Sequence, residues 1–300
     1  MFVAGIDGGG THTRLELRDG ENRLLHREEF GPFNLNAIGE AAFRQLLAQV
    51  FAACGDMTEC VGLCVGGAGV SNPALGEILS QELKKARFHG SWKLCGDQEI
   101  ALRGAMEGPG IIVIAGTGSI CFGKNALGQT ARSGGYGHLI DDGGSGYALG
   151  RDVLSAAVRQ CDGRNPERGI LDEVYRRLGK ETPEAIVSFV YSPKTDKAAL
   201  ARFSSVALTL AEQGDSSALE ILEAGAGELY ELVAAVQRRL NLAGCTIALL
   251  GGLLTGDNAY RRRVAGKLSG LGRVVPAAHD ALWGAAQMAW ELSQAEKTMQ

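Results

Sequence analysis

The chain has 300 residues, enough for two domains of about 150 residues each. Its 30 basic and 34 acidic residues give a net charge of −4 without any block of five like charges, which argues against a nucleic-acid or membrane-surface protein. Glycine is in excess at 43 residues and proline is scarce at 7. This excludes a disordered Pro/Gly chain and indicates glycines that serve backbone conformation.

The first residues of the chain and its cysteines indicate the cellular compartment of the protein. No basic and apolar leader follows Met1, and no apolar run approaches 18 residues, so we expect a cytoplasmic protein without a membrane span. The seven cysteines form no C-x-x-C pair, and Cys64, Cys95 and Cys121 lie within apolar strand-like runs. Reduced core thiols are expected, rather than disulfides or a metal site.

The first third of the chain predicts a mixed sheet with helices. Three antiparallel strands come first, which excludes a simple βαβ beginning. The predicted strands are 1–6, 13–18, 23–29, 60–65 and 92–95. Apolar residues at helical spacing predict helices over 36–53, 75–86 and 98–106.

Near Gly108–Gly110 the pattern starts again, with strands at 111–115 and 120–124 around a glycine turn. The repeat indicates either a weak internal duplication or a chance similarity of glycine turns. From Gly146 to about Leu240 the chain is mostly helical. The last predicted elements are a strand at 246–250, a basic helix at 258–270, a strand at 274–275 and a helix at 281–297.

Two glycine turns have the composition of phosphate-binding loops. Asp7-Gly8-Gly9-Gly10-Thr11 lies between two strands, where consecutive N–H groups can face phosphate oxygens. Asp7 at the strand end is suited to hold hydrated Mg²⁺. Gly116-Thr117-Gly118-Ser119 repeats the arrangement. The stretch 118–124 imitates a Walker A loop, but it reads as a strand and lacks the Ser/Thr, so we reject it.

Three further features carry candidate chemistry. Asp97 follows a short strand and begins a helix, which is typical of an N-cap or of a carboxylate at a ligand-binding sheet edge. The run from Ser133 to Gly146 contains six glycines together with Tyr136, His138, Asp141 and Asp142. This favours an ordered site over a floppy linker. A late strand ends in Gly251-Gly252, where a flat ligand can lie against the backbone.

These pieces, in this order, resemble the sugar kinase/Hsp70/actin superfamily. The motifs DGGGT, GTGS and GGYGHLIDD together resemble its N-acetylglucosamine kinase branch, within the BadF/BadG/BcrA/BcrD ATPase family. The resemblance runs from Gly5 to about Ala289. It implies an α/β fold of two actin-like (ribonuclease H-like) domains, each a mixed sheet flanked by helices, with the active-site cleft between them. We expect a smaller domain at 1–110, joined by the closing helix at about 287–300, and a larger domain at 111–286.

The resemblance also assigns roles to individual residues. Asp97 would be the catalytic base, and Asp7 would position Mg²⁺. The phosphates of ATP would contact Gly8, Gly9, Gly10, Thr11, Thr13, Gly116, Thr117, Gly118 and Ser119, and the adenosine Gly251 and Gly252. The sugar would contact Asn34, Asn36, Gly67, Ala68, Asp97, Gly135, Tyr136, Gly137 and Asp142.

Two departures from the family pattern lie on the sugar side. Tyr136 replaces a tryptophan, and Gly143 replaces a glutamate, which would free room and remove a hydrogen-bond acceptor. The implied reaction is phosphorylation of an amino sugar at O6 by ATP and Mg²⁺, with N-acetylglucosamine as substrate and glucosamine or N-acetylmuramic acid as alternatives. A non-catalytic ATP-driven activator is a more distant alternative. We expect a homodimer that binds neither nucleic acid nor membrane.

Overall fold

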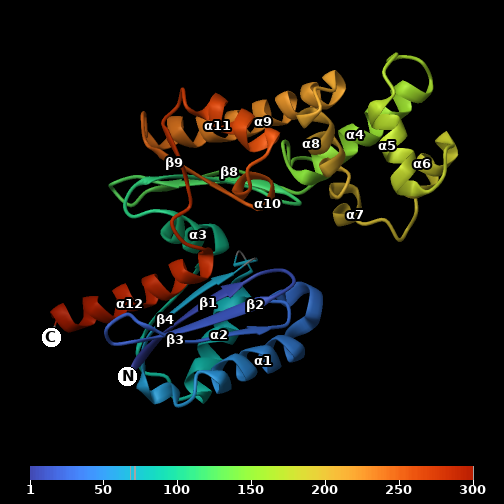
Figure 1. Ribbon diagram of the computed structural model, residues 1–300. Helices are drawn as coiled ribbons and strands as arrows, with labels where there is room; N and C mark the ends of the chain where they lie inside the picture. The colour runs from blue at the N-terminus through green and yellow to red at the C-terminus, as the bar shows by residue number, and fades with distance from the viewer. Residues whose placement is uncertain (68, 71, 300) are drawn as a thin grey trace. The chain divides into compact units, whose positions relative to one another are not determined.

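The computed structural model describes residues 1–67, 69–70 and 72–299. The chain divides into two compact units, one formed by Met1–Gly108 with Ala277–Gln300 and the other by Pro109–Pro276. The chain therefore leaves the first unit and later returns to it. The chain re-enters the first unit at Ala277, whereas the sequence analysis predicted this point near residue 287. Each unit contains one five-stranded mixed sheet (Figure 1).

The sheet of the first unit has the order β3-β2-β1-β4-β5. Its strands are β1 (Phe2–Gly8), β2 (Thr13–Asp19), β3 (Leu24–Phe30), β4 (Cys60–Gly67) and β5 (Ser91–Gly96). The central strand β1 pairs antiparallel with β2 and parallel with β4. Because helices cover both faces of the sheet, β1 and β4 are buried throughout nearly their whole length, which explains their continuous apolar runs.

Four helices of the first unit flank this sheet. The helices are α1 (Leu35–Ala53), α2 (Pro73–Lys85), α3 (Asp97–Ala105) and α12 (Ala281–Met299). Figure 1 shows α1 and α2 on one face and α12 with α3 on the other. Phe33, Phe43 and Leu79 belong to the core on the first face, while Ile100 and Ala285 belong to the smaller core on the second.

Several glycines of the first unit are required by packing rather than by turn conformation. A Cβ atom on Gly5 would lie 2.2 Å from the backbone nitrogen of Ala286, and one on Gly62 would lie 2.3 Å from the carbonyl oxygen of Ala289. Helix α12 therefore rests directly on the backbone of β1 and β4. The expectation that the glycine excess serves backbone conformation was incomplete, because only part of the glycines have positive φ.

The sheet of the second unit has the order β10-β9-β6-β7-β8. Its strands are β6 (Gly110–Ala115), β7 (Ser119–Lys124), β8 (Thr130–Gly134), β9 (Thr246–Leu250) and β10 (Arg273–Pro276). As in the first unit, an antiparallel three-stranded meander is followed by two parallel strands. This shared topology supports the duplication interpretation. Strand β8 was missed because its sequence, TARSG, is short and polar.

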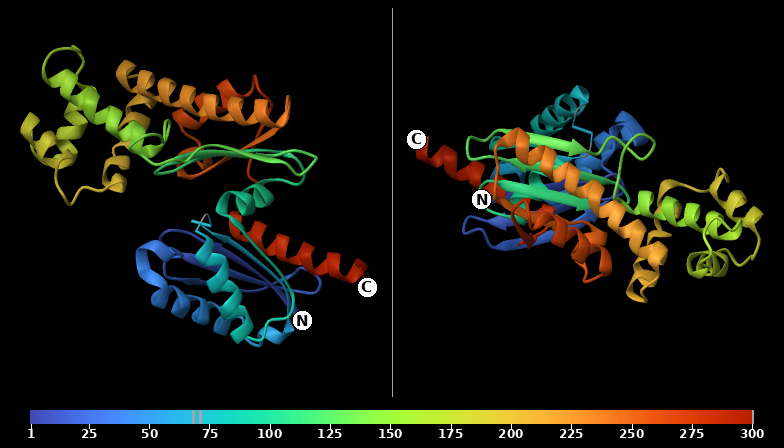
Figure 2. Two further views of the ribbon diagram at one scale, coloured as in Figure 1. Left: turned by 180° about the vertical axis from the view of Figure 1, so that it is seen from behind. Right: turned by 90° about the horizontal axis from the view of Figure 1, so that it is seen from above.

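The second unit carries most of the helices. They are α4 (Gly146–Cys161), α5 (Gly169–Leu178), α6 (Pro183–Val190), α7 (Lys197–Ala201), α8 (Ser204–Glu212), α9 (Ser216–Leu240), α10 (Gly252–Thr255) and α11 (Ala259–Leu268). The right-hand view of Figure 2 shows α9 crossing over the strands, while α5 and α6 lie beyond the end of the sheet. The predicted α/β fold of two mixed sheets flanked by helices is confirmed.

The cysteines are free thiols, and five of the seven are buried. Burial raises the pKa of the Cys54 thiol to about 12, so this group is unreactive near neutral pH. Within the described residues, no cluster of three His, Cys, Asp or Glu side chains is arranged to hold a metal ion. In the same part of the chain, no helix has the length and hydrophobicity needed to span a bilayer.

Candidate active site

The carboxyl ends of three parallel strands meet at one edge of the first sheet. In the strand register, Gly8 of β1 stands beside Gly67 of β4, and Gly67 stands beside Gly96 of β5. Asp7 and Asp97 are chain neighbours of Gly8 and Gly96. Two carboxylates that belong to separate sequence motifs therefore lie at the same edge, where the ligands of open α/β sheets bind.

Asp97 presents its carboxylate at this edge. It is the first residue of α3, and Gly96 is the N-cap, so the interpretation of Asp97 as the cap is wrong. Its side chain is exposed, and Oδ1 accepts a hydrogen bond of 2.9 Å from the backbone N–H of Gln98. A carboxylate in the first turn is stabilised by the helix dipole. Asp97 is therefore accessible and held by the helix start.

Asp7 is largely buried and ion-paired. Its side chain is 12% exposed, and Oδ2 lies 2.5 Å from a guanidinium nitrogen of Arg14 on β2. A second carboxylate, that of Asp280, lies 3.7 Å from Arg14. Partial burial acts to lower the pKa of Arg14, but the hydrogen bond and charge of Asp7 outweigh it and raise that pKa. Asp7 thus forms an ion pair with Arg14 beside the first glycine loop.

The first glycine loop is held to the core of its unit. Gly9 donates its N–H to the carbonyl of His12 and accepts from the N–H of Phe33, each at 2.9 Å. A Cβ on Gly8 would lie 2.4 Å from the ring of Phe33, whereas one on Gly10 would meet nothing. The loop is therefore open at Gly10, which leaves its backbone accessible to an anion.

Thr13 differs from the sequence prediction. It was expected to face the phosphates of ATP, but it is fully buried and its hydroxyl donates a 2.7 Å hydrogen bond to the carbonyl of Gly31. Thr11, in contrast, is exposed at the loop. The hydroxyl of Thr11 is therefore accessible to a ligand, whereas that of Thr13 links β2 to Gly31, the residue that follows β3.

The asparagines assigned to the sugar lie at helix starts. Asn34 is the N-cap of α1 and accepts a 3.2 Å hydrogen bond from the N–H of Ala37. Asn36 is exposed and accepts a 3.1 Å hydrogen bond from Asn72, the N-cap of α2. Asn34 directly follows Phe33, whose ring packs against Gly8 and Gly67, so its backbone lies close to the same sheet edge. Ala68 lies outside the described residues.

The second glycine loop is fixed by the residues that follow β8. The hydroxyl of Ser119 donates a 2.7 Å hydrogen bond to the carbonyl of Gly143, and its N–H donates one of 3.2 Å to Oδ1 of Asp142. Gly116 accepts a 2.7 Å hydrogen bond from the N–H of Gly146 at the start of α4. Ser119 is thus buried and occupied, whereas Thr117 is exposed.

A cavity of about 430 Å³ brings two predicted nucleotide loops together in the second unit. Gly116 and Thr117 of the second glycine loop and Gly252 of the late glycine pair contribute to its wall. Gly251 has φ 88°, and a Cβ there would lie 2.3 Å from the carbonyl oxygen of Ala115, so only glycine fits. Sequence reasoning missed Arg202, which is the charged residue among the described residues that line this cavity.

The glycine-rich loop between β8 and α4 is ordered by internal hydrogen bonds. Tyr136 is 63% exposed, with the Arg132 guanidinium 4.7 Å from the centre of its ring. Asp142 is only 4% exposed and has φ 64°, a conformation that is uncommon for a residue other than glycine. The hydroxyl of the buried Tyr260 donates a 2.6 Å hydrogen bond to the carbonyl of Gly144. The loop is therefore an ordered structure with one aromatic ring exposed.

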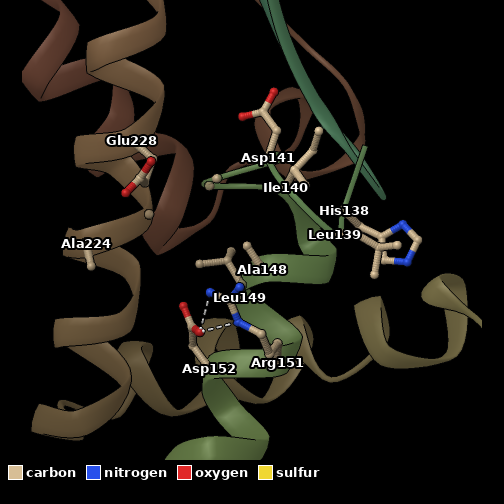
Figure 3. A pocket seen from close by; sticks show the side chains of 13 residues that line it. His138, Leu139, Ile140, Asp141, Ala148, Leu149, Arg151, Asp152, Ala224 and Glu228 are labelled. Carbon is tan, nitrogen blue, oxygen red and sulfur yellow. Dashed lines mark hydrogen bonds and ion pairs between the residues drawn. The ribbon is translucent and has the colours of Figure 1, made fainter. Parts of the chain in front are cut away.

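A second cavity, of about 390 Å³, lies between this loop, α4 and α9 (Figure 3). Glu228 projects from α9 toward the loop, and Arg151 and Asp152 on α4 form an ion pair at 2.8 Å. A Cβ atom on Gly143 would lie 2.5 Å from a carboxylate oxygen of Glu228. The expectation that Gly143 frees room and removes an acceptor is therefore wrong, since Glu228 fills that space with a carboxylate.

The fold and the paired glycine loops define the class as the actin-like sugar kinases. A solved structure from Chromobacterium violaceum, provisionally named an N-acetylglucosamine kinase, matches with a TM-score of 0.72 and 26% identity over 98% of this chain and 99% of that one. A glucokinase of the ROK family from Streptomyces griseus shares the fold at a TM-score of 0.56.

The sequence model of the BadF/BadG/BcrA/BcrD ATPase family matches residues 4–289, and the chain belongs to this family. The N-acetylmuramic acid/N-acetylglucosamine kinase of Clostridium acetobutylicum is 31% identical, with 86% of this chain and 87% of that protein covered. The N-acetyl-D-glucosamine kinase of Dictyostelium discoideum is 30% identical, with 81% of each covered. The predicted family is confirmed.

Proposed function

We propose that this protein is an ATP-dependent kinase that phosphorylates an amino sugar at O6, with N-acetylglucosamine as its substrate. The observation that carries the proposal is the exposed Asp97 at the sheet edge shared with Asp7. An ATP-driven activator has no need of a carboxylate beside a sugar. The names of the two kinases to which the chain is 30% and 31% identical support an amino sugar as the acceptor.

In the proposed reaction, Asp97 accepts the proton of the sugar's C6 hydroxyl as the oxygen attacks the γ-phosphorus of ATP. The carboxylate is accessible, as a general base must be. Phosphoryl transfer otherwise depends on positioning and on neutralising the charge of the phosphates. The open backbone at Gly10 and the hydroxyls of Thr11 and Thr117 are the groups available for that role.

The carboxylate of Asp7 is a suitable ligand for Mg²⁺. Asp7 supplies a single hard oxygen donor, and Mg²⁺ in phosphoryl-transfer sites commonly takes one or two carboxylates and completes its shell with water and substrate phosphates. The ion would neutralise phosphate charge, while Asp7 would position it from the strand end. Arg14 is the group that balances the charge of Asp7 when no cation is bound.

We further propose that the protein is cytoplasmic and forms a homodimer.

Sugar recognition is assigned to the loop after β8 and to Asn34. The exposed ring of Tyr136 offers an apolar face to a sugar ring or an acetamido methyl group, and Gly135 and Gly137, both with positive φ, present it at the surface. Asn34 has donor and acceptor groups for a hydroxyl. Asp142 would contribute its carboxylate, of which Oδ1 already accepts a hydrogen bond from the N–H of Ser119.

The test of the function is an ADP-release assay across amino sugars and plain hexoses. We expect N-acetylglucosamine to exceed glucose in kcat/KM, because a site with hydrogen-bonding groups for a substituent rejects an analogue that lacks it. Product analysis should place the phosphate on O6. A protein that turned over glucose faster than every amino sugar would contradict the proposal, as would ATP hydrolysis that no sugar accelerates.

Arg202 should contribute to nucleotide affinity. Its cation lines the cavity that contains Gly116 and Gly252, and a guanidinium pairs readily with phosphate oxygens. We expect Arg202→Ala to weaken ATP binding by about tenfold, as for the loss of one hydrogen bond to a charged group. Calorimetric titration of ATP measures the effect.

The matched control is Lys197→Ala, which removes a cation from the same helical segment without altering the cavity wall. Adenosine should bind both variants equally. If ATP affinity fell equally in the Lys197 variant, the effect would be one of general charge and the assignment of Arg202 would be incorrect.

A further inference from the structure

The carboxylate of Glu228 occupies the position in which a side chain at residue 143 would lie. Relative to a Cβ on Gly143, the nearest atoms are the Oε2, Cδ and Cβ atoms of Glu228 at 2.5, 3.0 and 3.1 Å. The close approach of the Cβ atom shows that α9 itself, and not only a flexible side-chain end, lies against the loop. A carboxylate from α9 therefore stands beneath the loop that we assign to the sugar.

The charges around this cavity leave a net negative field. Of the residues that the structure describes, the lining contains three carboxylates, those of Asp141, Asp152 and Glu228, and one cation, Arg151. Arg151 is paired with Asp152, whose charge it balances. Asp141 accepts a 3.1 Å hydrogen bond from the N–H of Tyr136. Within the described residues, Glu228 has no cationic partner, and its side chain points toward the loop (Figure 3).

The carbonyl of Gly143 connects this carboxylate to the rest of the site. It accepts the hydrogen bond of the Ser119 hydroxyl, and Ser119 in turn donates its N–H to Asp142. Gly143, in the loop that carries Tyr136 and Asp142, therefore lies against Glu228 on one side and is hydrogen-bonded to the second glycine loop on the other. The cavity itself is not lined by Tyr136 or Asp142, but Gly143 directly follows Asp142, so the carboxylate of Glu228 lies against the chain neighbour of a residue that we assign to the sugar. The field of a unit charge extends over about 8 Å at physiological ionic strength.

We propose that Glu228 determines the charge preference of the sugar site, so that the enzyme selects neutral amino sugars and rejects those with an anionic substituent. This inference rests on the proposed function. The name of the Clostridium acetobutylicum relative contains two sugars, N-acetylmuramic acid and N-acetylglucosamine. The proposed selectivity distinguishes them, because N-acetylmuramic acid carries an additional lactyl ether with a carboxylate. Repulsion between that carboxylate and Glu228 disfavours N-acetylmuramic acid.

The test compares kcat/KM for N-acetylglucosamine and N-acetylmuramic acid in the wild-type protein, Glu228→Gln and Glu231→Gln. Glutamine keeps the size of the side chain and removes its charge. Glu231 lies on the same helix outside the cavity lining and serves as the matched control. Wild type should prefer N-acetylglucosamine, and Glu228→Gln should raise the relative rate with N-acetylmuramic acid about fivefold, the effect of one unit charge at a few ångströms in water.

Several outcomes would overturn the inference. An unchanged ratio in Glu228→Gln would do so, and an equal change in Glu231→Gln would attribute the effect to general charge. A wild type that prefers N-acetylmuramic acid would also contradict it. Failure of the underlying function is distinguishable, since in that case the wild-type protein would phosphorylate neither sugar and no ratio could be measured.

Discussion

Asp97→Asn should lower the rate of sugar phosphorylation by about 10²–10⁴-fold, the usual contribution of a general base. Asparagine keeps the shape of the side chain and can still accept the hydrogen bond from the N–H of Gln98, but it cannot accept a proton. Because Asp97 is exposed, the substitution should leave the fold and ATP binding intact. Steady-state kinetics and calorimetric titration of ATP measure the two effects.

Glu99→Gln is the matched control for this variant. Glu99 is also an acidic residue in the first turn of α3, but it is paired with Lys93 at 3.0 Å. Its neutralisation should change activity little. If Asp97→Asn retained more than half of the wild-type rate, Asp97 would not be the base, and a loss of ATP binding in parallel would indicate a structural defect.

Asp7→Asn should lower kcat/KM by about 100-fold, comparable to misplacing a reacting group by one ångström. The amide is a weaker ligand for Mg²⁺ than a carboxylate and leaves Arg14 without its closest partner, so the cation of Arg14 would face the metal and repel it. The Mg²⁺ concentration for half-maximal activity should rise. Titration of MgCl₂ at fixed ATP measures this shift.

Asp280→Asn is the control, because Asp280 is the other carboxylate near Arg14, at 3.7 Å. Asparagine can also replace it in accepting the 2.8 Å hydrogen bond from the N–H of Trp283. The Mg²⁺ dependence of this variant should match that of the wild type. An Asp7→Asn protein with an unaltered Mg²⁺ requirement would show that the metal is positioned by another group.

The sequence predicts local elements of this fold well, because their signals lie within a few residues. Glycine turns between alternating strands identified the first and second glycine loops, and the apolar stretch before Asp97 identified the end of β5. The parallel register that brings Gly8, Gly67 and Gly96 together depends on pairing between distant segments. It follows from the family resemblance rather than from any local pattern.

The roles of single polar groups were less predictable. Thr13 and Ser119 were assigned to phosphates, but both hydroxyls donate to backbone carbonyls of their own unit, and the sequence does not show which way a short side chain turns. Arg202 and Glu228 carry no motif at all. They reach their cavities only because α7 and α9 pack beside loops far away in sequence.

The contact between α12 and the bare backbone of Gly5 and Gly62 also constrains the order in which the chain can mature. During synthesis on the ribosome, β1 and β4 emerge early, but the helix that covers their second face is made only after the whole of Pro109–Pro276. The second unit is continuous in sequence and can close around its own core while the first still exposes one side of its sheet. The first unit is thus completed only after the second has been made, and its apolar strands are the surface that a nascent-chain chaperone would meet.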